Sequence, residues 1–367
     1  QISERFQNKF QNKFRKKSCF KKIKAIHLHQ NITRKNMKRY GILIVLMALI
    51  CACSPQNEKE KHQSSRNNVI NVKNQIKEID TENEVLIGNH SRATYTNDYL
   101  IIRDHQAWNG VIHLFDKTDF HYITSAGNKG EGPDELTIVG NLYVDEARKK
   151  IYIADNGKNK IFSYDIDSII AMPDIYRHQL KTRINGSQFP NQAIYINDTL
   201  SYCTIIVPTS FQTFDQMIGK WNMLTGEIKT IGEKHPDTHQ KRSKIAVSMD
   251  KKMIVEAYYN YDLMNISDLD GNIQCYIYGP DWETKGLETF GDVMITPNHI
   301  LVGYSGEKWA TAKGKKIHVF DLKGNYQKTL DIGYAISSCC YDKTHHRLFM
   351  VFDDEIQFGY LNLEGII

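Results

Sequence analysis

The feature that most constrains the fold of this chain is a hairpin unit that recurs six times. Each unit is an alternating apolar strand that ends at Asp or Asn, followed by a short turn and another strand. The closest two units, at Asp321 and Asn362, are 41 residues apart, and the widest, at Asp165 and Asn222, are 57 apart. This spacing is typical of a four-stranded propeller blade, which takes about 40–50 residues. The six positions are Asp116, Asp165, Asn222, Asp268, Asp321 and Asn362.

The turns of these units have the chemistry of tight hairpins. Asp268 and Asp321 each begin a short Asp-x-x-Gly-Asn turn, in which the carboxylate can accept hydrogen bonds from backbone amides. Gly271 and Gly324 supply the positive φ that such a turn requires. Two more strands precede each hairpin, most clearly over residues 142–165, so that one unit amounts to four antiparallel strands.

The repeat therefore predicts an all-β chain, with a six-bladed β-propeller of four-stranded antiparallel blades over residues 70–367. The aromatic content (Tyr 20, Phe 15) against only 8 Pro suits β-structure. The sixth unit stops before its fourth strand, so we expect an N-terminal strand, residues 69–72 or 84–87, to complete the last blade and close the ring. A β-sandwich or two smaller β domains is the alternative.

The N-terminal part has the features of an export signal. Lys38 and Arg39 precede a short apolar run and the sequence Ile50-Cys51-Ala52-Cys53, which is the layout of a bacterial secretory signal. This sequence also resembles the lipobox of bacterial lipoproteins, and that resemblance implies that Cys53 carries lipid and anchors the protein to a membrane. An ordinary signal peptide with a chance Cys, or an uncleaved anchor, is the alternative. The resemblance implies a lipid-anchored protein of the bacterial cell envelope, in the outer membrane, on its periplasmic or surface face.

We accordingly expect four parts in this chain. Residues 1–36 form an upstream extension outside the native protein, 37–52 a lipoprotein signal peptide, 53–69 a polar flexible tether, and 70–367 the propeller. Much of the net charge of +5 lies before residue 40, so charge gives no case for nucleic-acid binding. The cysteines of the propeller show no metal-ligand spacing, and we expect them to be buried as small apolar residues, although an exported protein can pair two of them. They are Cys203, Cys275, Cys339 and Cys340.

One segment resembles a known family. Gly-x-x-Gly-Glu-Gly-Pro-x-Glu over residues 127–135, followed by a blade, resembles the TolB-like six-bladed propellers found as bacterial lipoproteins. The strand pair from Val144 to Asp155 is similar to NHL-type repeats. The resemblance implies a propeller at the cell envelope and transfers no catalytic residue. The glycines could also suggest a phosphate-binding loop, but Lys then Ser or Thr does not follow, so we expect them to shape the connection between blades one and two.

Candidate site residues follow from the geometry expected of a propeller. Loops between second and third strands gather on one face, where ligands usually bind. Asp104, Asp155 and Asp353 end equivalent second strands, and three converging carboxylates would suit Ca²⁺, unless each caps its own loop. The aromatic residues of these loops could form a platform for a sugar or peptide, unless they pack between blades. The ligand-binding candidates are Asp104, His105, Trp108, Asp155, Tyr258, Tyr261, Glu307, Trp309 and Asp353.

These observations leave three functions open. The first is a non-catalytic binding or scaffold module for a protein, peptide or glycan, because no catalytic motif accompanies the tethered propeller. The second is a metal-dependent lyase or hydrolase with its metal in the central channel, which is analogy to related folds. The third is a structural component of an envelope complex.

Overall fold

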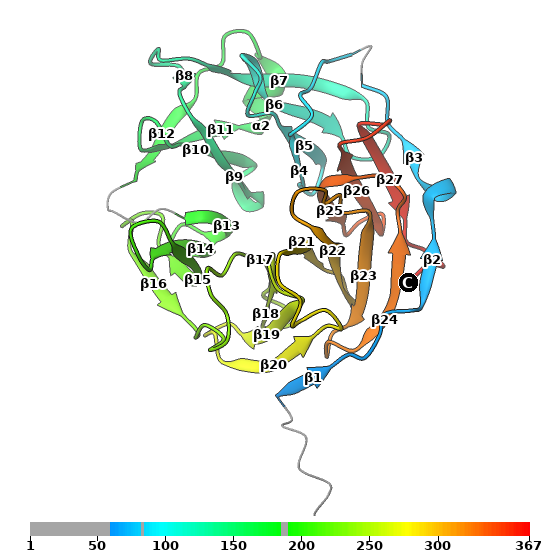
Figure 1. The fold of residues 1–367 in the computed structure, drawn as a ribbon. Helices are drawn as coiled ribbons and strands as arrows, with labels where there is room; N and C mark the ends of the chain where they lie inside the picture. The colour runs from blue at the N-terminus through cyan, green and yellow to red at the C-terminus, as the bar shows by residue number, and fades with distance from the viewer. Residues whose placement is uncertain (1–58, 82–83, 185–189) are drawn as a thin grey trace, which may run out of the picture. The chain divides into compact units, whose positions relative to one another are not determined.

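The computed structural model describes residues 59–81, 84–184 and 190–367. These residues form six β-sheets arranged as blades around one axis (Figure 1). The predicted all-β six-bladed propeller is confirmed. Within the described residues, none of the helices has the length and apolar character needed to cross a membrane.

Blades one to three follow one another along the chain, each starting with its innermost strand. Blade one has β4 (Arg92–Tyr95), β5 (Tyr99–Arg103), β6 (Asn109–Asp116), β7 (Tyr122–Lys129) and the short β8 (Glu135–Leu136). Blade two has β9 (Val139–Asp145), the 3-10 turn η2 (Glu146–Arg148), β10 (Lys150–Asp155), β11 (Lys160–Asp165), α2 (Ile166–Ala171) and β12 (Gln179–Arg183). Blade three has β13 (Pro190–Asn197), β14 (Leu200–Pro208), β15 (Phe214–Trp221) and β16 (Ile228–Ile231).

Blades four to six are each completed by a strand from the N-terminal segment. Blade four has β17 (Ser243–Ser248), β18 (Met253–Tyr258), β19 (Leu263–Asp268), β20 (Ile273–Tyr278) and β1 (Glu60–His62). Blade five has β21 (Leu287–Ile295), β22 (His299–Lys308), β23 (Lys316–Asp321), β24 (Tyr326–Asp331) and β2 (Val69–Asn71), which the 3-10 turn η1 (Lys73–Gln75) follows. Blade six has β25 (Ile336–Asp342), β26 (Arg347–Phe352), β27 (Phe358–Asn362) and β3 (Lys77–Glu78).

An N-terminal strand closes the ring, but it is neither of the two segments that the sequence suggested. β3 pairs antiparallel with β27, with Lys77 opposite Tyr360 and Glu78 opposite Gly359. Residues 69–72 instead lie against blade five, where β2 pairs parallel with β24. The apolar pattern of residues 69–72 is that of a strand, but a pattern does not say which sheet edge the strand joins.

The described part of the segment expected to be a flexible tether also joins a sheet edge. From Lys59 onward it follows the outer edge of the ring, and β1 pairs parallel with β20 (Figure 1). Polar composition is compatible with an edge strand, because one face of such a strand meets solvent. The propeller unit therefore begins near residue 59 and not at residue 70.

The six Asp or Asn residues of the repeat all accept hydrogen bonds from nearby backbone amides. Each accepts a hydrogen bond from a backbone amide two or three residues further on, which fixes the start of the connection after the third strand. At Asp165 the connection opens into α2, so this residue caps a helix instead of a hairpin turn. Gly271 and Gly324 adopt φ of 86° and 82°, as the tight turns require. The amide donors are those of Thr118, Ser168, Leu224, Asp270, Lys323 and Glu364.

Among the described residues the hydrophobic core has seven clusters: six lie at the boundaries between neighbouring blades, and the seventh, around Tyr258, lies within blade four. Ile101 of blade one, for example, packs in one cluster with Ile153 of blade two, and Leu301 of blade five packs with Leu348 of blade six. Both faces of the central strands are thus buried, and β18 and β26 are buried along their whole length. The four cysteines within the described residues are unpaired, and Cys203, Cys275 and Cys339 are buried, in line with the prediction.

Candidate functional site

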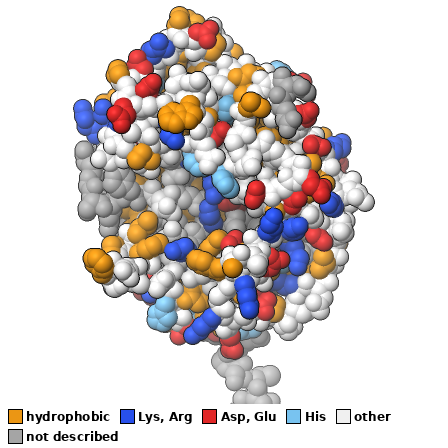
Figure 2. All heavy atoms as spheres, turned by 45° about the horizontal axis from the view of Figure 1, so that its top comes forward, with side chains coloured by type: hydrophobic (Ala, Val, Ile, Leu, Met, Phe, Trp, Pro, Cys, Tyr) orange, Lys and Arg blue, Asp and Glu red, His pale blue; other side chains and the backbone are white. Residues whose placement is uncertain are grey.

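A cavity of about 380 Å³ opens at one end of the central channel. The innermost strands of all six blades contribute residues to this cavity. In each blade these residues lie beside the end of the second strand; Lys244, for example, pairs with Ala257 near the end of β18. The cavity therefore lies at the face where loops between second and third strands gather. Basic side chains lie in a hollow near the middle of the ring (Figure 2). Its polar lining residues are Arg92, Thr94, Arg103, Asn141, Asn191, Gln192, Lys244, Asp292 and Ser338.

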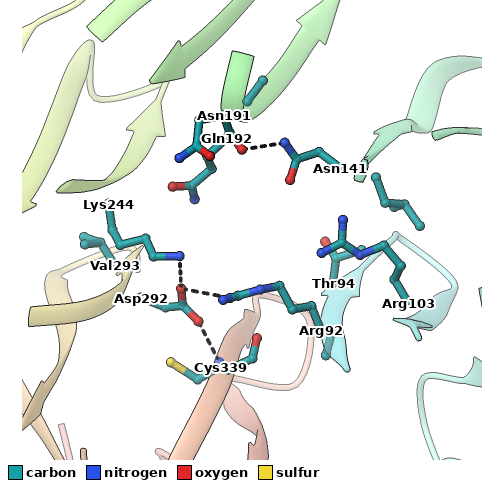
Figure 3. Close-up of a pocket in the computed structure, with 14 residues that line it drawn as sticks. Arg92, Thr94, Arg103, Asn141, Asn191, Gln192, Lys244, Asp292, Val293 and Cys339 are labelled. Atoms are coloured by element: carbon teal, nitrogen blue, oxygen red, sulfur yellow. Dashed lines mark hydrogen bonds and ion pairs between the residues drawn. The ribbon is translucent and has the colours of Figure 1, made fainter. Parts of the chain in front are cut away.

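Asp292 is the acidic centre of this lining. Its Oδ1 lies 3.5 Å from both the Lys244 Nζ and the Arg92 Nη1, and its Oδ2 accepts a hydrogen bond of 3.1 Å from the Cys339 amide (Figure 3). Burial raises the pKa of Asp292, but the two cations and these hydrogen bonds outweigh it and hold the pKa below its usual range. Asp292 is therefore ionised and ties blades one, four, five and six together at the channel.

A β-bulge explains why Asp292 reaches the channel. The pairing of β21 with β22 shifts register between Phe290 and Val293, so that Gly291 and Asp292 fall outside the regular ladder. A bulge re-aims the side chains of the residues it contains. A glycine inside a strand often marks a bulge, as Gly291 does here, but the sequence does not show which way Asp292 turns.

Arg103 differs from the other cations of the cavity. Its Nη1 donates to the Gly140 carbonyl, whereas its buried Nε has no hydrogen-bond partner. No carboxylate among the described residues forms an ion pair with it. Burial and the charge of nearby Arg92 lower the pKa of Arg103 to about 10. At neutral pH it is a charged guanidinium whose Nε–H is unpaired.

A second hollow of about 260 Å³ extends from the channel between blades four, five and six. Arg92, Lys244, Asp292 and Cys339 line both. Glycines form part of its wall, and a Cβ placed at Gly291 or Gly303 would meet its nearest atom only at 3.8 or 3.5 Å. The absence of side chains there leaves the hollow open. Its other lining residues include Tyr259, Glu288, Gly314 and Lys316.

Aromatic side chains stand at the rim of this second hollow. The Tyr259 hydroxyl donates to Glu288 at 2.5 Å, and its ring meets Trp309 edge to face at 5.7 Å. Trp309 is 48% exposed, and its Nε1 donates to the Leu287 carbonyl, which fixes the ring. The Arg242 guanidinium lies 5.3 Å from both the Trp309 and the Phe214 rings. These residues present a held, partly exposed aromatic surface beside a polar cavity.

The three carboxylates considered for calcium do not converge. Asp104 is buried and accepts hydrogen bonds from the amides of Gly88, Gln106 and Ala107. Asp155 is also buried and accepts four, from the amides of Thr137, Ile138, Gly157 and Lys158. Asp353 is exposed, and its neighbour Asp354 makes the equivalent contact, to the Ala335 amide. Each buried carboxylate caps its own loop and the linker that enters its blade.

The donor set of the channel does not fit a divalent cation either. The residues lining its cavity bring three cations and one carboxylate together, so a divalent cation would meet repulsion. Among the described residues, three potential ligand side chains come within reach of one another at Asp116, Asp119 and His121, on an exposed turn of blade one. There Asp119 already pairs with His121 at 2.7 Å.

The aromatic candidates separate into different environments. Tyr258 is fully buried and packs against Tyr261 at 6.5 Å, so Tyr258 belongs to the packing of blade four and not to a platform. Trp309 lines neither cavity itself, but its ring packs on Tyr259, which lines the second hollow, and this contact places it at the rim. Trp108 is 72% exposed on blade one, where the Lys129 ammonium lies 5.5 Å from its ring. Trp108 lines neither cavity.

The two polar candidates of these loops make local contacts. His105 is half-buried, and its carbonyl accepts a weak hydrogen bond from the Lys129 ammonium. Glu307 is exposed and accepts a hydrogen bond from the Lys313 amide. Neither lines the channel cavity.

Sequence reasoning missed the residues that line the channel. Arg92, Lys244 and Asp292 lie on innermost strands, whereas the candidates named from the sequence belong to the loops expected after second strands. The available signal was a charged residue directly before an apolar one within a first strand, as in Ser243-Lys244-Ile245 or Gly291-Asp292-Val293. Such a charge must face either solvent or the channel.

The glycine-rich motif has a structural role. The Gly132 amide donates to the Glu135 carboxylate at 2.8 Å, and the Lys158 ammonium donates to the Gly132 and Glu135 carbonyls at 2.6 Å each. These contacts hold the link from blade one to blade two, as the sequence suggested.

Comparisons with known proteins support the propeller. A family model described as 6-bladed beta-propeller (DUF5128) matches residues 58–196. No curated protein matches the chain. A solved member of the DUF4221 family from Bacteroides vulgatus is 11% identical, with a TM-score of 0.52 over 79% of this chain and 99% of that one. A luciferin-regenerating enzyme is 9% identical, with a TM-score of 0.52 over 78% of this chain and 94% of that one. At these identities the likeness extends to the fold alone, and the chain is a six-bladed β-propeller.

Proposed function

We propose that this protein is a non-catalytic binding module of the bacterial cell envelope, anchored by lipid on Cys53, and that its ligand enters the channel from the loop face. The observation that carries the proposal is the joined pair of cavities at that face, with a polar floor and an aromatic rim. Cys53 lies outside the described residues, and the anchor rests on the lipobox-like sequence alone.

The shape of the site favours an extended ligand with a narrow end. The cavity of about 380 Å³ falls in the range of small-ligand pockets, which starts at about 300 Å³, and the adjoining hollow adds about 260 Å³ to it. A flat protein surface could reach Trp309 but could not fill the channel. A glycan or peptide end can occupy the polar cavity while its next unit packs on Trp309 and Tyr259.

The metal-dependent enzyme is less well supported. Its metal would need several oxygen or nitrogen ligands in the channel, and the lining described above offers one carboxylate, already engaged by Lys244 and Arg92. The residues present do not fit that role.

Array screening with point variants tests the binding proposal. Purified protein is applied to glycan and peptide arrays, together with Gly303→Leu, which fills the second hollow, and Trp309→Ala, which removes the rim. We expect both variants to lose the wild-type signals, and Trp309→Ala to weaken the affinity for any identified ligand about tenfold or more.

Trp108→Ala is the matched control, because it removes an even more exposed tryptophan whose ring lies beside Lys129 of blade one, whereas Trp309 packs on the cavity-lining Tyr259. It should bind as the wild type does. Equal losses in Trp108→Ala and Trp309→Ala, or full binding by a folded Gly303→Leu, would show that the ligand binds elsewhere.

A further inference from the structure

Two arginines face each other across the strands at the channel. Arg92 of β4 and Arg103 of β5 are directly opposite partners in the antiparallel ladder, so their side chains leave the same face of the sheet, and both line the channel cavity. Like charges in directly opposite positions destabilise a strand pair. The arrangement is therefore unfavourable unless an anion compensates it.

The described residues compensate only part of this charge. Arg92 lies 3.5 Å from Asp292, which it shares with Lys244. The third cation, Arg103, has no such partner, and its buried Nε–H lacks an acceptor. Three cations against one carboxylate leave a formal surplus of two positive charges in a cavity of about 380 Å³.

An unpaired acceptor lies in the same cavity. The Oε1 atom of Gln192 is buried and has no hydrogen-bond partner, while the neighbouring Asn141 amide already donates to the Asn191 carbonyl at 2.6 Å (Figure 3). A buried polar group without a partner is costly in free energy. A ligand that satisfied both atoms would offer an oxyanion to Arg103 and a hydroxyl donor to Gln192.

We infer that the ligand is an acidic saccharide, whose carboxylate or sulfate lies against Arg103 and Arg92 and whose hydroxyl donates to Gln192. This inference rests on the proposed binding function and specifies its ligand. The planar guanidinium of Arg103 suits an oxyanion, because its Nε–H and one terminal N–H can donate in parallel to two oxygens. Trp309 and Tyr259, at the rim of the adjoining hollow, would receive the next sugar of a chain.

Calorimetric titration of the purified protein tests the inference. The probes are D-glucuronate and D-glucose 6-sulfate, with D-glucose as the neutral analogue and sodium sulfate as the free anion. We expect both acidic sugars to bind and D-glucose to bind at least about tenfold more weakly. Arg103→Met should lower the affinity for the acidic sugars by about 10- to 100-fold. Arg103→Lys should recover part of the loss, since it restores the charge but not the paired donors.

Two further measurements separate a ligand-binding role of Arg103 from a structural one. Without ligand, Arg103→Met should melt close to the wild-type temperature, because removing a like charge beside Arg92 offsets the loss of the hydrogen bond to the Gly140 carbonyl. Arg177→Met, which removes an exposed arginine outside both cavities, should leave binding unchanged. A large drop in melting temperature for Arg103→Met would contradict the inference.

The outcomes distinguish this inference from the binding function itself. If sodium sulfate binds as well as the acidic sugars, the site takes a free anion and the saccharide inference is wrong. If neutral ligands from the arrays bind Arg103→Met as they bind the wild type but are lost in Gly303→Leu, the anionic inference fails while the binding function stands. Failure of the wild type to bind either acidic sugar with a dissociation constant below about 1 mM also overturns it.

Discussion

Arg66 and Asp262 form a buried ion pair that joins the N-terminal segment to blade four, with 2.7 Å between the Arg66 Nη1 and the Asp262 Oδ1. The two side chains are 6% and 0% exposed. Burial raises the pKa of Asp262 more than the Arg66 charge lowers it, so the pKa lies above its usual range. For Asp262, removal from water thus costs more than the attraction to Arg66 returns.

The first prediction follows from this balance. Arg66→Met leaves Asp262 buried without its cation and should lower the free energy of unfolding by about 3–5 kcal/mol. The double variant Arg66→Met with Asp262→Asn should lose markedly less, because no charge stays buried. The interaction free energy between Arg66 and Asp262 is measured by urea unfolding of the wild type, both single variants and the double variant. Additive losses would contradict this account.

The same pair predicts a pH effect in the single variant. The folded state keeps a proton on Asp262 at pH values where the unfolded chain has released it, so stability falls as pH rises from the unfolded pKa through the folded one. The deficit of Arg66→Met relative to the wild type should therefore shrink when unfolding is measured towards pH 4. A deficit that stays constant with pH would show that lost packing of Arg66 is responsible.

The second prediction concerns Asp155. Because this buried carboxylate accepts four backbone amides, Asp155→Ala should lower the free energy of unfolding by about 3 kcal/mol. Asp155→Asn should recover part of that loss, since its amide oxygen still accepts. Binding of any channel ligand by folded protein should be unchanged. Loss of binding in Asp155→Asn at full stability would instead indicate a direct ligand contact.

The third prediction concerns acid stability. His113 is 1% exposed, its Nδ1 lies 2.7 Å from the Ser125 Oγ, and burial lowers its pKa from 6.5 to about 4. The unfolded chain takes up a proton below about pH 6.5 that the folded state takes up only near pH 4. Stability is thus fully present at neutral pH and declines between these values, by about 3 kcal/mol for this residue.

His318 occupies the equivalent position in blade five, beside the Thr329 Oγ1, and burial lowers its pKa well below the usual value. It should add to the same decline. Denaturant unfolding at pH 7, 5.5 and 4.5 measures the slope. His113→Asn, which can keep the bond to Ser125, should be less stable at pH 7 but show a shallower slope. An unchanged slope would assign the acid sensitivity to other groups.

The fourth prediction compares two glycines. At Gly291 an added Cβ finds space, so Gly291→Ala should leave stability unchanged or raise it by about 0.4–1 kcal/mol. At Gly279 the Cβ would overlap the Asp262 carboxylate, so Gly279→Ala should displace that group and cost about 1–3 kcal/mol. Thermal melting of both variants measures the two effects. An equal loss of stability in Gly291→Ala and Gly279→Ala would contradict the account based on the space around each Cβ.

The fifth prediction tests the anchor. Cys53→Ser removes the thiol that a lipid would occupy, so the protein should move from the membrane fraction to the soluble fraction in a bacterial host. Intact mass of membrane-extracted wild type should show acyl chains on Cys53. An unmodified Cys53 would rule the anchor out.

The sequence by itself determined the scaffold, because that information is local. An Asp or Asn at the end of each third strand, as at Asp268, accepts amides within a few residues, and alternating strands on either side bury both faces. Six such units are enough to predict six blades whatever the rest of the chain does. The role of the Gly127–Glu135 motif was predictable for the same reason.

Only the tertiary structure decided the N-terminal edge strands and the channel lining. Lys77 meets Tyr360 although 283 positions separate them in the chain, and no local pattern specifies which sheet edge a short polar strand joins. Asp292 faces the channel because a bulge shifts the register of β21. The charge surplus around Arg92 and Arg103 can be counted only when the fold places Lys244 and Asp292, from two other blades, in the same cavity. Closure of the ring forms the channel cavity, because it brings together residues from the innermost strands of all six blades.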